Sequence, residues 1–126
     1  MEVLGLGVDV VEIPRIRAAI ARHGDRFLRK VFTPAETAYC RLKRDSGPSF
    51  AARWAAKEAV AKAYGHGWEG LWWLNLVEVT REASGKPGIR LLAGLERAQA
   101  GRGVKRIELS LTHGRDVAVA QALLLG

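Results

Sequence analysis

The sequence is poor in cysteine and has no long apolar segment. Its single cysteine, Cys40, cannot form an internal disulfide, which is typical of a reducing compartment. No stretch approaches the roughly 18 uninterrupted apolar residues of a membrane helix. The start, MEVLGLGVDVVEI, lacks the basic region of a signal peptide and carries acids within its apolar run. We therefore expect a soluble, cytoplasmic protein without membrane contact.

Several common site motifs are also missing. Gly5 and Gly7 follow the start of a strand-like run, but Val10 occupies the place of the third glycine in a dinucleotide fingerprint. The histidines lack zinc-ligand spacing: His23, His66 and His113. These absences argue against a dinucleotide-binding fold and a zinc site.

The chain has the size and composition of one ordinary globular domain. It contains 126 residues, of which 48% are hydrophobic and 26% are charged. It shows no internal repeat, low-complexity tract or linker. We therefore predict a single domain over residues 1–126.

Positive charge is concentrated in one part of the chain. The net charge is +7, and residues 15–44 alone carry nine Lys or Arg against two acids. A local excess of this kind suggests a surface that meets nucleic acid, a phosphorylated ligand or an acidic protein. A solvated basic face explains the charge equally well.

The apolar pattern and the turn residues predict an α+β domain in which an antiparallel sheet packs against helices. Strands are expected at residues 3–11, 76–80 and 89–92, with a hairpin formed by residues 106–112 and 117–125. Helices are expected from Pro14 to Gly24, from the capping box Thr33–Glu36 towards Cys40, and over residues 93–100. One long Ala-rich helix covers residues 50–64.

Two opposite charges stand in that Ala-rich helix. Glu58 and Lys62 lie among small apolar residues on a helix that is apolar on both sides. They can form a surface ion pair worth about 0.3–0.5 kcal/mol. Asp9 is similarly placed inside an apolar strand, where it can cap nearby backbone N–H groups. Alternatively, the two carboxylates share a divalent cation such as Mg²⁺, with Lys62 beside the phosphates of a ligand.

Five segments resemble one protein family in order and spacing. They are GLGVDVVEIPRI, FLRKVFTPAE, FAARWAAKEAVAKAYGHG, GKPGI and LSLTH, and they resemble the bacterial holo-acyl-carrier-protein synthases. These are small, single-domain 4′-phosphopantetheinyl transferases. The resemblance extends over essentially the whole chain. It departs from the family at His66, where a small hydroxyl residue is usual, and at Trp54, which replaces phenylalanine.

The resemblance implies a reaction and a set of residues for it. Members use Mg²⁺ to transfer the phosphopantetheine arm of coenzyme A to a serine hydroxyl of an apo acyl carrier protein of fatty-acid synthesis, releasing adenosine 3′,5′-bisphosphate. Asp9 and Glu58 are then the metal ligands, and Lys62 contacts the pyrophosphate or the transferred group. The serine proton passes to a metal-held water or to Glu58 acting through water.

The resemblance also implies partners. The family is trimeric and binds coenzyme A across subunit interfaces, and its first helix meets the acidic carrier through arginines that match Arg15, Arg22 and Arg26. The positions that match the nucleotide site, besides Lys62, are Arg53, Gly65, Gly67, Pro87, Ser110, Thr112 and His113. The cluster Trp68, Trp72 and Trp73 has no role in this scheme beyond packing or interface burial.

Two other hypotheses compete with the enzyme. A basic nucleic-acid-binding domain accounts for the charge and the tryptophans, but it leaves Asp9 and Glu58 unexplained, because carboxylates repel phosphate. For this reason we expect no nucleic-acid partner. A catalytically silent trimer, in which Glu58 and Lys62 form a buried pair, is the second alternative.

Overall fold

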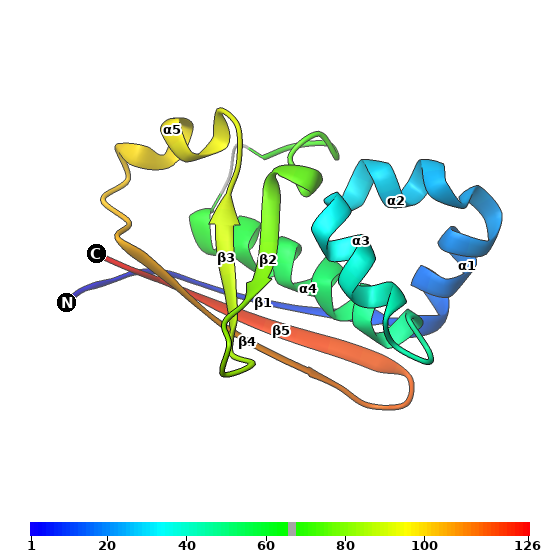
Figure 1. Cartoon of the computed structure of the whole chain (residues 1–126). Helices are drawn as coiled ribbons and strands as arrows, with labels where there is room; N and C mark the ends of the chain where they lie inside the picture. Colours follow the sequence, from blue (N-terminus) through cyan, green and yellow to red (C-terminus); the bar gives the residue numbers. More distant parts are fainter. Residues whose placement is uncertain (66–67) are drawn as a thin grey trace.

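The computed structural model describes residues 1–65 and 68–126, except for the side chain of residue 98. Figure 1 shows the order of the elements: β1 (Val3–Glu12), α1 (Ile13–His23), α2 (Asp25–Val31), α3 (Pro34–Arg41), α4 (Gly47–Tyr64), the 3-10 turn η1 (Leu74–Leu76), β2 (Val77–Arg81), β3 (Pro87–Leu91), α5 (Leu95–Ala100), β4 (Arg106–His113) and β5 (Val117–Leu125). The combination of helices with antiparallel strands confirms the predicted α+β class.

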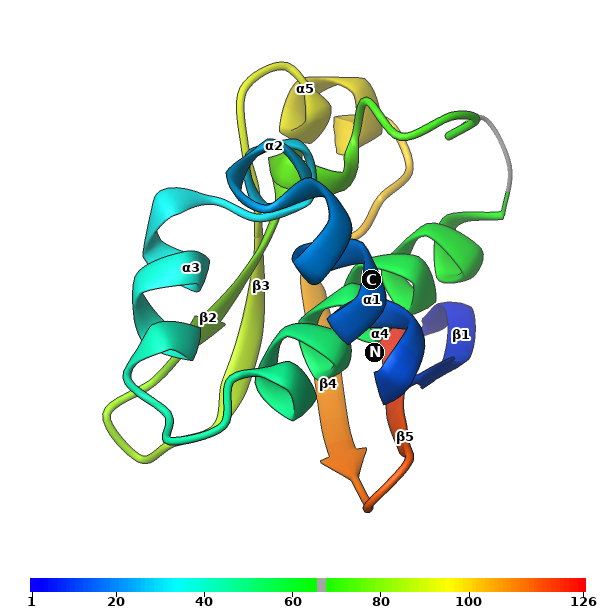
Figure 2. The same ribbon diagram turned by 90° about the vertical axis from the view of Figure 1, so that its right-hand side faces the viewer.

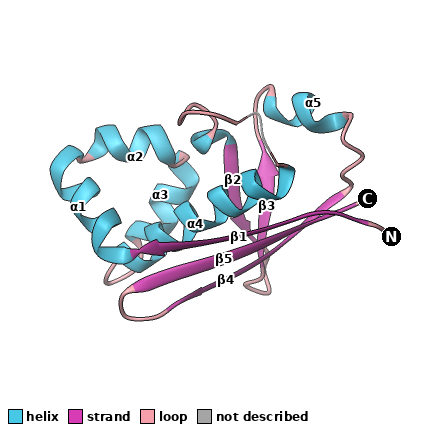
Figure 3. Cartoon of the chain, turned by 180° about the vertical axis from the view of Figure 1, so that it is seen from behind, coloured by secondary structure: helices cyan, strands magenta, loops and turns pink. Residues whose placement is uncertain are grey.

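The larger sheet has the strand order β1-β5-β4 and is antiparallel throughout. β4 and β5 form the predicted hairpin, and the central strand β5 alternates small buried residues with more exposed ones. Its buried members face the helix α4: Ala118, Ala120, Ala122 and Leu124. Figures 1 and 3 show α4 lying along one face of this sheet. The Ala-rich sequence of α4 is therefore the inner layer of the core, as its apolar character on both sides predicted.

Two glycines bring β1 unusually close to α4. A Cβ atom on Gly7 would overlap the carbonyl oxygen of Ala59, and one on Gly5 would overlap that of Ala63. Backbone atoms of a helix cannot move aside as a flexible side chain can. Only glycine on the strand and small residues on the helix therefore allow this contact.

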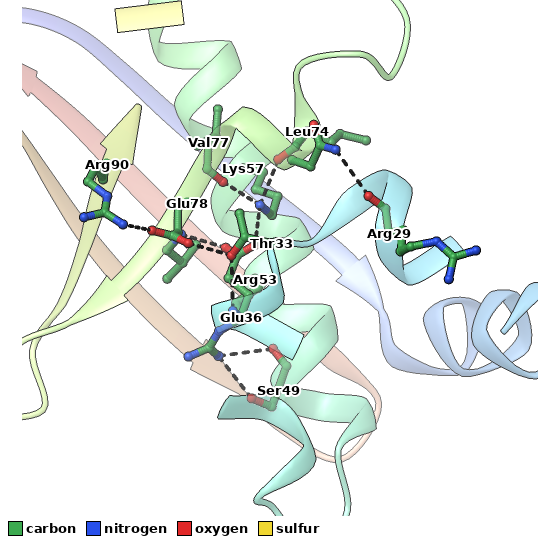
Figure 4. Close-up of polar contacts among 12 residues, drawn as sticks. Arg29, Thr33, Glu36, Ser49, Arg53, Lys57, Leu74, Val77, Glu78 and Arg90 are labelled. Carbon is green, nitrogen blue, oxygen red and sulfur yellow. Dashed lines mark hydrogen bonds and ion pairs between the residues drawn. The ribbon is translucent and has the colours of Figure 1, made fainter. Parts of the chain in front are cut away.

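The smaller sheet, β2-β3, is joined to α3 and α4 by a buried polar network (Figure 4). The predicted capping box is present, because Glu36 Oε1 accepts a hydrogen bond from Thr33 N at 2.8 Å and Thr33 Oγ1 accepts one from Glu36 N at 3.2 Å. Lys57 of α4 donates to Glu36 Oε1 at 2.8 Å and also to the carbonyls of Leu74 and Val77.

Both side chains of this ion pair, Glu36 and Lys57, are 0% exposed. Burial lowers the pKa of the Lys57 ammonium, and the adjacent Glu36 carboxylate opposes that change. A buried pair of this kind is tolerated only where hydrogen bonds use the donors and acceptors fully, as they do here. The sequence does not distinguish Lys57 as a buried residue, since nothing in the Ala-rich pattern shows which lysine faces inward.

The helical region after β1 differs from the prediction at one point. Gly24 ends α1 with a φ of 54°, as expected, but the next residue begins α2, which was not predicted. The positive φ turns the chain sharply. Arg26 consequently lies on α2, whereas Arg15 and Arg22 lie on α1, so the expectation that the first helix carries all three arginines is wrong for Arg26.

On β1, the sheet face turned away from α4 is apolar and exposed to solvent. On β1 the exposed side chains are Leu4, Leu6, Val8 and Val10. Within residues 1–65 and 68–126, no helix combines the length and apolarity needed to cross a membrane.

Replacing Gly7 by alanine tests the close approach of β1 and α4. We expect Gly7→Ala to lower the free energy of unfolding by about 1–3 kcal/mol or more, because the added methyl group meets helix backbone. Urea unfolding followed by circular dichroism measures the change. Gly114→Ala is the matched control, since nothing lies within 4 Å of a Cβ there. Equal stability of the two variants would show that the strand can move away from the helix at little cost.

Candidate functional site

Asp9 follows Gly5 and Gly7 on the face of β1 that meets α4. Its carboxylate Oδ1 accepts a hydrogen bond from Lys62 Nζ at 2.9 Å, and the side chain is only 15% exposed. Lys62 Nζ also lies 3.2 Å from the Val8 carbonyl oxygen. The close contact between strand and helix therefore brings Asp9 to Lys62, as the metal-phosphate hypothesis requires.

Glu58 lies one helical turn before Lys62 and is half-buried. Burial raises the pKa of the Glu58 carboxyl, and the negative charge of Asp9 raises it further, while Lys62 and Arg15 oppose the change. The effect of the Asp9 charge on Glu58 is consistent with a position of both carboxylates beside Lys62. The three predicted catalytic residues are thus brought together from β1 and α4, and Arg15 of α1 acts on the same cluster.

The donor set at this cluster suits a hard divalent cation. Asp9 and Glu58 supply carboxylate oxygens, and no third His, Cys, Asp or Glu joins them in the described part of the chain. Mg²⁺ commonly takes one or two carboxylates, keeps several waters and completes its shell with phosphate oxygens. The residues present therefore fit Mg²⁺ bound together with a phosphorylated ligand.

A cavity of about 630 Å³ lies on another side of the molecule, between α3, the start of α4 and the end of β4. Its lining includes the predicted residues Arg53, Thr112 and His113. It also contains cations that the sequence analysis did not assign: Lys43, Arg44 and Arg81. Lys43 and Arg44 belong to the basic segment noted above, whereas nothing in the sequence distinguished Arg81.

Arg53 is the buried cation of this cavity. It is 2% exposed, its Nη1 donates to Ser49 Oγ at 3.0 Å, and its guanidinium lies 4.3 Å from the centre of the Tyr39 ring. No described carboxylate pairs with it, and its buried Nε has no partner. A buried guanidinium without a carboxylate partner favours binding of an anion, because the anion would compensate its charge.

Two further cationic side chains lie close to the ring of Tyr39. Lys43 Nζ lies 4.9 Å and the Arg81 guanidinium 5.1 Å from the ring centre. Burial alone would raise the pKa of the Tyr39 hydroxyl, but Lys43, Arg81 and Arg53 together lower it. This part of the cavity is thus strongly electropositive, which favours binding of an anionic ligand.

The carboxylate cluster and the cationic cavity use different faces of α4. Arg53 and Glu58 differ by about 140° around the helix, and Arg53 and Lys62 are separated by roughly 13.5 Å along its axis. The structure therefore does not bring all predicted site residues into one place within a single chain.

The remaining predicted nucleotide-site residues are spread more widely. Gly65 ends α4 with a φ of 98°, which favours glycine. Pro87 begins β3 opposite Arg81, and Ser110 is exposed on the outer sheet face of β4. Gly67 and His66 lie outside the described residues.

The predicted carrier-binding arginines belong to two helices, α1 and α2, and Figure 2 shows how these helices lie. Arg15 and Arg22 are exposed on α1, opposite the buried Ile13 and Ile16. Arg26 is exposed on α2 and lines a separate cavity with Leu71 and Trp72.

The three tryptophans differ in their surroundings. Trp73 is buried, and Trp68 packs between Trp73 and Tyr64, with ring centres at 5.4 and 5.0 Å. These two are core residues, as expected for packing. Trp72 is 58% exposed and has no such contact among the described aromatic rings. The described residues as a whole thus combine a carboxylate pair with a cationic cavity, which is suited to a divalent cation and a phosphorylated ligand.

Comparisons with known proteins agree with this arrangement. Residues 5–122 match the 4′-phosphopantetheinyl transferase superfamily. The holo-[acyl-carrier-protein] synthase of Desulforudis audaxviator (strain MP104C) is 46% identical over 124 residues, covering 98% of this chain and 94% of the relative. The crystal structure of the Neisseria meningitidis synthase has a TM-score of 0.90 at 28% identity, covering 99% of this chain and 100% of that chain.

A further solved structure contains a ligand. The holo-(acyl-carrier-protein) synthase of Bacillus anthracis str. Ames, in complex with CoA (3′,5′-ADP), has a TM-score of 0.76 at 28% identity, covering 97% of this chain and 96% of that chain. The chain therefore belongs to the 4′-phosphopantetheinyl transferase superfamily. The resemblance to the holo-acyl-carrier-protein synthases, stated from the sequence, is confirmed.

The raised pKa of Glu58 predicts how its replacement changes stability. The folded state binds the Glu58 proton more tightly than the unfolded chain does, because the carboxyl has its ordinary pKa of 4.5 in the unfolded chain and a raised pKa in the folded state. Ionisation of Glu58 therefore lowers the free energy of unfolding. This loss begins as the pH rises above the unfolded pKa and is complete once the pH exceeds the raised pKa of the folded state. We expect Glu58→Gln to raise the melting temperature at about pH 7.5 and to lose this advantage near about pH 4, in metal-free buffer.

The measurement is thermal unfolding of wild type and variant at both pH values. Glu82→Gln, which changes an exposed carboxylate in the β2-β3 turn, is the control. A stabilisation that is the same at both pH values would contradict the assignment, because it would not depend on the ionisation of Glu58.

Proposed function

We propose that this chain transfers the 4′-phosphopantetheine group from coenzyme A to a serine hydroxyl of an apo acyl carrier protein. The serine oxygen forms a bond to the phosphorus that bears pantetheine, and the bond from that phosphorus to the bridging oxygen breaks. The serine gives up a proton, and adenosine 3′,5′-bisphosphate leaves. The observation that carries this proposal is the meeting of Asp9, Glu58 and Lys62 in a member of a transferase superfamily.

Asp9 and Glu58 are the residues that would hold Mg²⁺. When bound, the ion supplies positive charge to the phosphate oxygens, which disperses the negative charge of the pyrophosphate. Asp9 is held in place by β1 and by its bond to Lys62. Glu58 is fixed by the rigid helix α4, so that both carboxylates are positioned before any ligand binds.

Lys62 has the charge and reach to neutralise the departing phosphate. It is 55% exposed, and its ammonium is the nearest described cation to Asp9. Glu58 is suited to take the serine proton through a water molecule, because its raised pKa makes it a stronger base than an ordinary carboxylate. Arg15 adds positive charge on the side from which α1 faces the cluster.

The cationic cavity is the proposed site of the coenzyme A phosphates. Its cations come from separate parts of the chain and line one space, and they include the buried Arg53. Coenzyme A carries several phosphate groups, and guanidinium and ammonium groups are their usual partners. The synthase of Bacillus anthracis, which has this fold, was crystallised with CoA.

The separation of the two sites supports an assembly in which neighbouring chains share one active site. Within one chain the carboxylate cluster and the cationic cavity lie on different faces of α4, with Arg53 and Lys62 about 13.5 Å apart along its axis. The exposed apolar side chains of β1 offer a surface for such an assembly, since patches of this kind commonly mark subunit contacts. We propose a homotrimer, the number implied by the resemblance, with the carboxylate cluster of one chain facing the cationic cavity of the next.

The exposed arginines of α1, Arg15 and Arg22, are proposed to guide an acidic carrier protein to the site. Contacts of this kind act largely on the rate of association and are weakened by salt. The carrier of fatty-acid synthesis in the cytoplasm is the partner that the resemblance implies.

Mass spectrometry of the carrier tests the function directly. An apo carrier protein incubated with enzyme, coenzyme A and Mg²⁺ should gain the mass of one phosphopantetheine group at its serine, and EDTA should prevent the gain. We expect Asp9→Ala and Glu58→Gln each to slow transfer by about 100-fold or more, as loss of a group that stabilises the transition-state charge does. Glu82→Gln is the control and should retain wild-type activity. Near-normal activity of either site variant would remove the metal-ligand assignment.

Mixing of subunits tests the shared site. Arg53→Ala and Glu58→Gln chains should each be inactive alone. Co-expressed in equal amounts, they should regain about one quarter of wild-type activity, because that share of interfaces joins an intact Glu58 to an intact Arg53. Activity of the purified mixed assembly is measured against each parent. If the mixed trimers remain inactive, the two residues serve the same chain and the interface proposal is wrong.

A further inference from the structure

The ring of Tyr39, on α3, lies among three cations that come from three different parts of the fold. Its centre is 4.3 Å from the Arg53 guanidinium of α4, 5.1 Å from the Arg81 guanidinium of β2, and 4.9 Å from Lys43 Nζ in the segment after α3. Cations at this distance are attracted to the negative face of an aromatic ring. The three cationic side chains, called the cation trio below, are Lys43, Arg53 and Arg81.

The members of the cation trio repel one another, because three positive charges surround one side chain. No carboxylate of the described residues forms an ion pair with any of them. Arg81 Nη1 donates instead to the Gly85 carbonyl at 2.6 Å, and Arg53 donates to Ser49. The ring of Tyr39 is the group that all three cations share, so it offsets part of their repulsion.

The acid among the described lining residues of the cationic cavity, Asp45, is already paired. Its two carboxylate oxygens accept hydrogen bonds from Arg17 of α1 at 2.6 and 2.7 Å. These bonds to Arg17 lower the pKa of the Asp45 carboxyl. The charge of Asp45 is thus compensated from α1, and the positive charge of the cation trio is left for a ligand.

A second set of contacts fixes Arg53, as Figure 4 shows for Ser49. Arg53 Nη1 donates to Ser49 Oγ at 3.0 Å, and Ser49 Oγ donates to Cys40 Sγ at 3.2 Å. Cys40 is fully buried, and burial raises the pKa of its thiol, which keeps it uncharged. Two successive residues of α3 therefore hold the Arg53 guanidinium, Tyr39 through its ring and Cys40 through Ser49.

The charge of the cation trio suits a phosphate monoester. A monoester carries nearly two negative charges near neutral pH, whereas each phosphate inside a diphosphate bridge carries one. Guanidinium groups bind such oxygens through pairs of parallel hydrogen bonds. Coenzyme A has both kinds of phosphate, a diphosphate bridge and a monoester on its ribose, and dephospho-coenzyme A lacks the monoester.

We propose that Tyr39 is a positioning residue of the cationic cavity, whose ring gathers the cation trio around the ribose monoester and so sets a preference for coenzyme A over dephospho-coenzyme A. The inference rests on the proposed function and adds an uncharged specificity-determining residue to it. Lys43 and Arg81 are exposed, so that without the ring their long side chains spread into solvent. Arg53 remains held by Ser49.

Steady-state kinetics with two phosphopantetheine donors test this role. We expect Tyr39→Leu to raise the KM for coenzyme A about tenfold, with kcat and the KM for the apo carrier unchanged. The KM for dephospho-coenzyme A should rise less than about threefold, because this donor lacks the monoester. Tyr39→Phe keeps the ring and should keep the preference. An equal loss for both donors would overturn the proposal.

The matched control is Leu42→Ala, at the end of the same helix. Leu42 is 83% exposed and lines none of the described cavities, so both KM values should stay at the wild-type level. Circular dichroism checks that each variant is folded. Tyr39→Met fills similar space without a ring and gives the same test should Tyr39→Leu fail to fold.

A double variant shows whether Tyr39 acts through the cations. Arg81→Met alone should also raise the KM for coenzyme A, because it removes one of the gathered charges. If Tyr39 positions Arg81, Tyr39→Leu should cause a smaller further loss in the Arg81→Met chain than it causes in wild type. Losses that simply multiply would show that the two residues act independently and would overturn the positioning role.

Calorimetric titration with adenosine 3′,5′-bisphosphate separates this inference from the proposed function, because it requires no transfer. Tyr39→Leu should bind this probe about tenfold more weakly than wild type, and Tyr39→Phe nearly as well as wild type. Equal affinity of wild type and Tyr39→Leu, or no binding by wild type, would overturn the inference even where wild type modifies the carrier. If wild type adds no mass to the carrier, the proposed function fails, and a weaker titration of Tyr39→Leu still supports its role in phosphate binding.

Discussion

The contact between Gly7 and the backbone of α4 is the constraint on which the site depends. Because β1 lies directly on the helix at Ala59 and Ala63, the next inward residue of the strand, Asp9, meets the helix within hydrogen-bonding distance of Lys62. A strand held away by an ordinary side chain would leave the two carboxylates on separate elements with solvent between them. The small residues of α4 are therefore as necessary for the site as the charged ones.

Local signals in the sequence were sufficient for most of the fold. The capping box at Thr33, the proline at the start of α1 and the alternating pattern of β4 and β5 each depend on neighbouring residues, and the structure has all of them. The helix α2 was missed because Gly24 was interpreted only as a stop. A glycine with positive φ equally allows the chain to turn and begin another helix, and local sequence does not distinguish these outcomes.

The site was predictable where the resemblance named residues and unpredictable where long-range packing chose them. Asp9, Glu58 and Lys62 come together as expected, whereas the cavity around Arg53 includes Arg81, which no local pattern marks. Lys57 was overlooked for the same reason. Its partner Glu36 is far away in sequence, and only the tertiary fold shows that this lysine is buried while Lys62 is exposed.

Two neighbouring residues of α4 show how the structure separates stability from reactivity. Lys57 is fully buried, and its ammonium is satisfied by Glu36 and two backbone carbonyls, so that the pair joins α3, α4 and β2 without any unsatisfied charge. The pKa of Glu58, on the next position, is raised first by burial and then by the negative charge of Asp9, and the nearby Lys62 and Arg15 do not fully offset these effects. An incompletely compensated pair of acids in an otherwise basic protein is a cost to folding that a bound cation removes. A divalent cation, as proposed for this site, would relieve the imbalance that weakens the free chain at Glu58, and the rigid network at Lys57 fixes the helix that carries both Glu58 and Lys62.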